Sequence, residues 1–364
     1  MRFPRARKIL KAFLRAALVA VCIFAVAAIV FAVHCSTIRG SFQPSAATST
    51  GSGIPGYART EDDTFLTYAE WYIVWSYQEK AAWQQSRLPS GFPYFGAIEQ
   101  YWSGYCCSYG VVRSRYAFNF GDHLMLVVIG TSFTMEYALK GAYENTVARA
   151  TEWLGGRAMT EEDQYAARVA RNYGLFVADR PFYEFPFFTA LRGLWADTGL
   201  WGPHLLRKWE RKAWLSLDYG IEGVYCGVIE LASHAVYGVE EDATYAWIEN
   251  APDAVLSSVP DVRKLKSVGA DSVIVRMPRY RKFTDAAGQL LRAQARFVEI
   301  AGNRQMMVTA IVPRDWSYPL PVGELLFSSE ILTDTTRKRV ALRVPVADLA
   351  AVFGSVNVEH LYDY

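Results

Sequence analysis

The chain has 364 residues, enough for two domains that each bury a core. Its net charge of +2 excludes the broad basic surface typical of nucleic-acid binding, so we expect no nucleic-acid partner. The five cysteines lack zinc-ligand spacing, and the chain contains no P-loop, dinucleotide-binding or HExxH motif, so we expect no cofactor and no metal motif.

The first element is an uncharged apolar segment at 16–33, preceded by six basic residues and no acid: Arg2, Arg5, Arg7, Lys8, Lys11 and Arg15. Eighteen residues in a helix, at roughly 1.5 Å each, nearly match a hydrocarbon layer of roughly 30 Å. Because basic residues resist translocation, we predict that 1–35 holds a cytoplasmic N-terminus and an inner-membrane anchor, with the rest of the chain in the periplasm. The alternative is a cleaved signal peptide, whose apolar core is usually shorter.

A stretch rich in Ser, Thr and Gly at 36–60 predicts a flexible linker. The next region, 61–250, reads as helical, aromatic and membrane-associated. Thr67 and Glu70 have capping-box spacing, which predicts a helix start. The many Trp and Tyr residues that follow could lie against lipid headgroups or form an aromatic core, and both alternatives stay open.

An apolar run at 124–135 is too short for a typical membrane span and predicts a buried or interfacial helix. A model with two further crossings, near 122–139 and 218–237, is the alternative to a single anchor. Asp122-His123, just before the run, could be an acid–base pair, although a helix cap is the simpler interpretation. From Trp195 to Trp214, basic and aromatic residues alternate, which fits a helix on an anionic membrane face or an ordinary solvated face.

The most informative pattern is a polar stripe, which recurs every fourth residue: Asp218, Glu222, Cys226, Glu230 and His234. This spacing places the stripe on one slowly drifting face of a helix. We expect an ordinary amphipathic helix with this face in water. The alternatives are a proton-handling or catalytic site, with His123 as a further candidate, and a metal site at Glu230 and His234. An enclosed cavity with His123 or Glu136 opposite the stripe would favour a site.

At 251–364 the pattern changes to alternating strands and short helices. Two parts look alike, VIVRMP–helix–RFVEI and VALRVP–helix–VNVEHLY, and between them lie Gly302-Asn303 and two further predicted strands. Two βαβ-like halves joined by a hairpin predict a ferredoxin-like α+β sandwich. Of the cysteines, we expect Cys106 and Cys107 to be an unpaired buried pair, with oxidation to Cys35 outside the cytoplasm as the alternative.

Four segments carry a family resemblance: Thr64 to Ala82, Val127 to Thr146, Arg296 to Asn303 and the closing EHLYDY. They resemble an uncharacterised family of bacterial inner-membrane proteins, which has no assigned activity and supplies no site residues. We therefore expect a membrane-anchored, non-catalytic envelope protein that binds or organises lipid, or a partner protein through its C-terminal domain. The alternative is a membrane enzyme or a lipid- or proton-handling protein that uses the stripe at 218–234.

Overall fold

The computed structural model describes residues 35, 56–57, 65–113, 118–236, 243–269, 271–318 and 322–363. The predicted anchor at 16–33 and most of the predicted linker lie outside these residues. Among the described helices, none combines the length and the apolar character needed to cross a bilayer. That finding includes the helices over 122–139 and 218–236, where the sequence allowed two further crossings.

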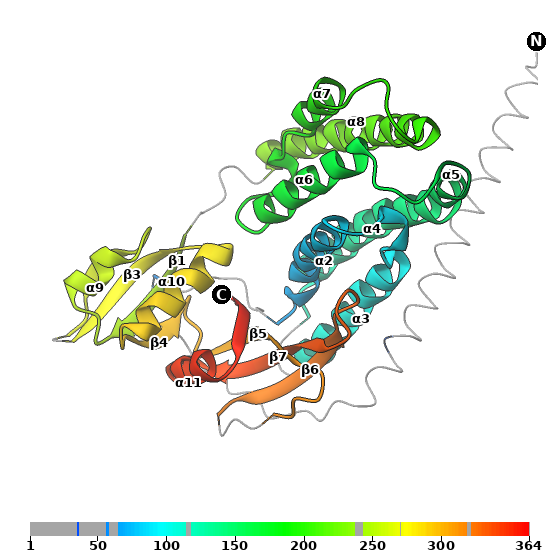
Figure 1. Cartoon of the computed structure of the whole chain (residues 1–364). Helices are drawn as coiled ribbons and strands as arrows, with labels where there is room; N and C mark the ends of the chain where they lie inside the picture. The colour runs from blue at the N-terminus through cyan, green and yellow to red at the C-terminus, as the bar shows by residue number, and fades with distance from the viewer. Residues whose placement is uncertain are drawn as a thin grey trace, which may run out of the picture.

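The chain is an α+β protein, in which a helical part is followed by antiparallel sheets (Figure 1). The helical part comprises α2 (Tyr68–Gln84), η2 (Pro89–Gly91), α3 (Tyr94–Arg113), α4 (Phe120–Tyr143), the π-helix η3 (Glu144–Ala148), α5 (Arg149–Gly155), α6 (Glu161–Phe176), η4 (Phe182–Glu184), α7 (Phe187–Asp197) and α8 (Leu205–Val236). Helix α2 starts where the sequence predicts, but the Thr67 side chain makes no capping hydrogen bond. The capping box is instead at the start of α6, between Thr160 and Asp163.

Most of the aromatic residues that follow Thr67 in α2, α3 and α4 form the core of the helical part. Ten rings from α2, α3, α4 and the η2–α3 turn are buried: Tyr68, Tyr72, Trp75, Tyr77, Phe92, Tyr94, Tyr101, Tyr105, Phe133 and Tyr137. Many meet edge to face, the geometry that the charge distribution of aromatic rings favours. Of the two alternatives for these rings, the aromatic core is correct.

A disulfide joins Cys35 to Cys106 in α3, so the prediction of an unpaired Cys106 is wrong. Cys107 is free, as predicted for that residue. Adjacent residues on a helix point about 100° apart, so only one of the two thiols can face Cys35. The bond therefore joins Cys35, which follows the predicted anchor at 16–33, to α3 in the helical part.

The strands form two sheets rather than the one sandwich that the sequence predicts. The first has the order β2-β3-β1-β4, and the second has the order β6-β7-β5-β8, with every neighbouring pair antiparallel. The first sheet and its helices comprise β1 (Ala243–Glu249), α9 (Asp253–Ser258), β2 (Arg263–Ser267), β3 (Ser272–Pro278), α10 (Tyr280–Arg292) and β4 (Arg296–Ile300). The second comprises β5 (Gln305–Pro313), β6 (Glu324–Glu330), β7 (Arg337–Pro345), η5 (Val346–Asp348), α11 (Leu349–Ser355) and β8 (Asn357–Leu361).

Numbered within each sheet, the two strand orders are identical, so the structure contains a repeat. The two segments that look alike in sequence, β3–α10–β4 and β7–α11–β8, occupy equivalent places in it. The prediction was wrong about the number of sheets because it missed β1 and β2. Strand β1 begins at Ala243, before the predicted boundary at 251, and all of β2 is exposed and without an apolar face.

The second sheet packs against α2, which connects the two parts of the molecule (Figure 1). Arg339 of β7 is buried and donates hydrogen bonds to Glu79 of α2, at 3.0 Å, and to Glu359 of β8, at 2.9 Å. Its guanidinium lies 4.2 Å from the ring centroid of Trp75. Trp71 stacks on His360 with ring centroids 3.5 Å apart.

Candidate functional site

The polar stripe of α8 divides into an inner and an outer part. The side chains of Asp218 and Glu222 face α4 and are 16% and 15% exposed, so the expectation that they lie in water is wrong. Glu230 is exposed, and the side chain of His234 lies outside the described part. A helical position drifts by about 40° every four residues, so the stripe that starts against α4 turns outward by Glu230.

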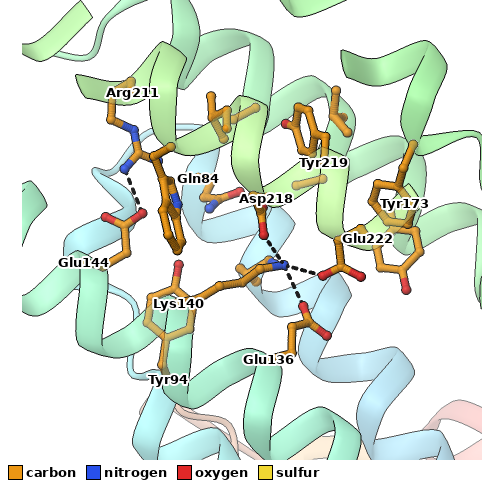
Figure 2. Close-up of a pocket in the computed structure, with 17 residues that line it drawn as sticks. Gln84, Tyr94, Glu136, Lys140, Glu144, Tyr173, Arg211, Asp218, Tyr219 and Glu222 are labelled. Carbon is orange, nitrogen blue, oxygen red and sulfur yellow. Dashed lines mark hydrogen bonds and ion pairs between the residues drawn. The ribbon is translucent and has the colours of Figure 1, made fainter. Parts of the chain in front are cut away.

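Lys140 of α4 meets the inner stripe at the centre of a buried cluster (Figure 2). Its ammonium lies 2.7 Å from Glu136, 3.0 Å from Glu222 and 3.2 Å from Asp218. The Tyr77 hydroxyl donates a hydrogen bond of 2.5 Å to the second oxygen of Glu136. Three carboxylates thus share one lysine in a place where water screens little charge.

The cluster borders a cavity of about 50 Å³ between α2, α4, α6 and α8 (Figure 2). Seven charged residues line it: Lys80, Glu136, Lys140, Glu144, Arg211, Asp218 and Glu222. The remaining wall combines polar side chains with apolar ones: Gln84, Tyr94, Ala166, Val169, Ala170, Tyr173, Phe187, Trp214, Leu215 and Tyr219. The cavity therefore offers charged and hydrogen-bonding groups beside apolar side chains.

Two of the lining groups have pKa values near neutral pH. Burial raises the pKa of Glu222 to about 7, against the opposing effect of Lys140. Burial, assisted by the charge of Lys140, lowers the pKa of Lys80 to about 8. Although burial alone would raise the pKa of Glu136, Lys140 and Lys80 hold it below its ordinary value. Perturbed pKa values in a cavity are typical of functional sites, although structural ion pairs cause them too.

A second charged cluster lies at the start of α8 and corrects the expectation of a membrane-facing or solvated basic helix there. The four cations Arg207, Lys208, Arg211 and Lys212 are all buried. Arg207 and Arg211 pair with Asp163 at 3.4 and 2.9 Å, and Lys208 pairs with Glu162 at 2.9 Å. These cations therefore pair with acids of α6, while Trp209 among them and Trp201 before α8 are exposed.

His123 is separate from the cavity. It is buried at the start of α4, where its Nδ1 is 2.8 Å from the Tyr105 hydroxyl and its ring stacks on Phe118. Asp122 bonds to the helix-capping residue Asn119, which supports the cap interpretation of this pair. Burial lowers the pKa of His123.

No group of acids, histidines and cysteines within the described part of the chain could hold a metal ion. Glu230 belongs to no such group, and the side chain of His234, its predicted partner, lies outside the described residues.

Sequence reasoning missed Lys80 and Lys140 as partners of the stripe. The Glu136–Lys140 pair had a detectable signal, because the two residues are four apart at the end of an otherwise apolar helix. Lys80 had none, since a single lysine in an aromatic helix reads as a solvated residue. Comparisons of the chain with family models, curated proteins and solved structures found no match, so the resemblance inferred from the sequence stays a prediction.

Proposed function

We propose that this protein works at a membrane of the cell envelope, where an uncharged face of α4 and α8 lies on lipid. The observation that carries this proposal is a set of exposed apolar side chains on the two helices: Leu124, Val128, Met135 and Leu139 on α4, and Leu217, Ile221, Val224, Val228 and Leu231 on α8. On α8 they are spaced alternately four and three residues apart, which keeps them on one side of the helix. We call these nine residues the apolar face.

The contacts between the helices place both halves of this face on the same side of the molecule. Lys140 meets Asp218 and Glu222, and Tyr225 meets Ser132, so the helices run antiparallel. On α4 Leu139 directly precedes the contact residue Lys140, and on α8 Leu217 and Ile221 directly precede its partners Asp218 and Glu222. Because both helices are right-handed, that one-residue step turns the side chain toward the same side in an antiparallel pair.

Charge is nearly absent from this surface. Among the described residues of α4, no exposed side chain is charged, and on α8 the exposed charged side chain is Glu230. Monomeric soluble proteins seldom expose contiguous apolar surfaces of this kind, which indicate contact with a membrane or another protein.

Two further observations favour lipid over a protein partner. Trp153 and Trp201, near the start of α8, are 84% and 77% exposed, and tryptophan is the residue preferred at water–lipid interfaces. The Cys35–Cys106 disulfide connects the chain following the predicted anchor to α3, which packs on α4. Disulfides persist mainly outside the cytoplasm, which also supports a periplasmic side for this part. For the C-terminal part, we infer two tandem ferredoxin-like units, because both sheets have that strand order.

Photo-crosslinking tests the proposal in the full-length chain. Benzoylphenylalanine replaces Ile221, and in a control it replaces Leu265, an exposed leucine of β2. In vesicles of phosphatidylethanolamine and phosphatidylglycerol, and in cell membranes, we expect lipid adducts at position 221 and none at 265. Adducts of position 221 with a protein would mean that a partner covers the apolar face. Equal lipid labelling at both positions, or none at either, would also refute the proposal.

A further inference from the structure

Five polar side chains of the cavity wall have no hydrogen-bond partner among the residues that the structure describes. They are Lys80, Gln84, Tyr94, Tyr173 and Tyr219, and each is at least nine-tenths buried. Buried polar groups normally have a partner, because an unsatisfied one costs about 1–3 kcal/mol. The polar atoms of these five side chains reach the cavity, so a small molecule bound there would supply their hydrogen bonds.

Lys80 is the unusual member of this set. Its ammonium lies 5.5 Å from the ring centroids of Tyr77 and Tyr137, and it makes no ion pair with any described residue. The nearby charges come from the two facing helices: Glu136 and Lys140 on α4, and Asp218 and Glu222 on α8. Lys140 engages all three of these carboxylates, which leaves Lys80 without a direct partner.

The charge of the wall restricts the ligand. Four carboxylates and three cations line the cavity, so an anion would be repelled. A cation would compete with Lys80 for the same space. The cavity of about 50 Å³ has room for only a few non-hydrogen atoms. A small, uncharged molecule with a carbonyl oxygen fits best, because it accepts hydrogen bonds from the tyrosines and Gln84 and places its carbon chain against Val169 and Phe187.

We propose that Lys80 is a nucleophile that forms an imine with a small, uncharged aldehyde bound in this cavity. The uncharged amine attacks the carbonyl carbon and, after proton transfer, gives a carbinolamine. Glu222, as the carboxylic acid, then protonates the departing hydroxyl group, and water leaves as the carbon–nitrogen double bond forms. One aldehyde and one amine thus give one protonated imine and one water, with the carboxylate of Glu222 left behind.

The surrounding charges suit both ends of this step. The imine product carries a positive charge on the nitrogen, and the excess of carboxylates stabilises it. An uncharged amine is available because at pH 7.5 a lysine with a pKa of about 8 is roughly one-quarter uncharged, compared with roughly one in a thousand for an ordinary lysine. Buried lysines with lowered pKa values are the usual nucleophiles of this chemistry.

Reductive trapping tests the proposal in the intact protein. The full-length chain is treated with acetaldehyde and cyanoborohydride at pH 7.5, and mass spectrometry measures the initial rate of alkylation at each lysine. We expect Lys80 to react at least ten times faster than Lys282, an exposed lysine of α10. Lys80→Arg keeps a cation in the cavity and should remove this fast adduct while leaving the reaction at Lys282 unchanged.

A pH series separates the role of Glu222 from a change in packing. The rate at Lys80 should rise as its amine loses a proton and fall as Glu222 loses its own, which gives a maximum near pH 7.5. In Glu222→Gln the fall at high pH should disappear, whereas Glu230→Gln, on the exposed part of the same helix, should keep it. If Lys80 reacts no faster than Lys282, the nucleophile is refuted. If Glu222→Gln keeps the fall at high pH, the assignment of Glu222 as the acid is refuted.

Discussion

Replacing Arg339 by Met should destabilise the whole molecule, because this residue connects the second sheet to the helical part. Arg339 is buried between Glu79 and Glu359, and its guanidinium lies against Trp75. Methionine retains much of the packing volume but leaves two carboxylates without their cation. Removing one partner of a buried ion pair costs about 3–5 kcal/mol.

The side chains of Glu79 and Glu359 are 13% and 15% exposed, so water can partly solvate them in the variant. We therefore expect the lower end of the range, a loss of about 3 kcal/mol. For domains of 150–250 residues, that loss corresponds to a fall in Tm of roughly 6–12 °C. Urea unfolding followed by tryptophan fluorescence, together with calorimetry, measures both quantities.

Arg314→Met is the matched control in the same sheet. Arg314 pairs with Glu330 at 2.7 Å, but the two side chains are 59% and 68% exposed, so the pair should contribute less than about 1 kcal/mol. A loss below about 1 kcal/mol in Arg339→Met, or equal losses in the two variants, would refute the importance of burial here. If Arg339→Met destabilises only the second sheet, and the helical part unfolds as in the parent, the two parts do not fold together.

Three further changes have defined outcomes. Cys35→Ser opens a loop of 71 residues and should lower the unfolding free energy by about 4 kcal/mol in non-reducing urea titrations. Cys107→Ser, at the free cysteine, should leave the unfolding free energy unchanged. Equal stability of Cys35→Ser and the parent would refute the cross-link. Gly130→Ala places a Cβ 2.1 Å from the Tyr101 ring and should lower the unfolding free energy by about 1–3 kcal/mol. In the same assay Gly220→Ala, whose Cβ meets nothing within 4 Å, should raise the unfolding free energy by about 0.5–1 kcal/mol. Folding raises the pKa of Glu222 from about 4.5 to about 7, so the native state binds this proton more tightly than the unfolded state. The resulting stabilisation is complete below pH 4.5 and is lost as the pH rises through about 7. Glu222→Gln should therefore become more stable relative to the parent between pH 5 and pH 8, and a constant difference would contradict the raised pKa.

The candidate site was only partly predictable. Residues four apart in a helix must share a face, so the sequence was enough to group Asp218 with Glu222. It could not reveal that this face packs on α4, because the partners Lys140 and Lys80 come from helices distant in the chain. The drift of the stripe around the helix also separates Glu230 from the cluster. Only the packing of α8 on α4 shows at which residue the stripe leaves the contact and becomes exposed.

The fold was predictable to a similar degree. Strands with an apolar alternation or run, such as β3, β5 and β7, were found, and so was the similarity between two β–α–β segments. Strand β2 reads RKLKS and is exposed throughout, so no burial pattern marked it. Without β2 and β1 the two segments appeared to be halves of one sheet, although each belongs to a separate four-stranded sheet.

The contact between Arg339 and Glu79 also affects how the protein is made. The two residues are 260 positions apart, and at about 5–20 residues per second a ribosome needs roughly 13–50 s to synthesise the chain between them. During that time the side of α2 that carries Trp71 and Trp75 waits for the strands that cover it. Until β7 and β8 emerge, this aromatic side of α2 is exposed apolar surface, which makes the nascent chain prone to aggregate.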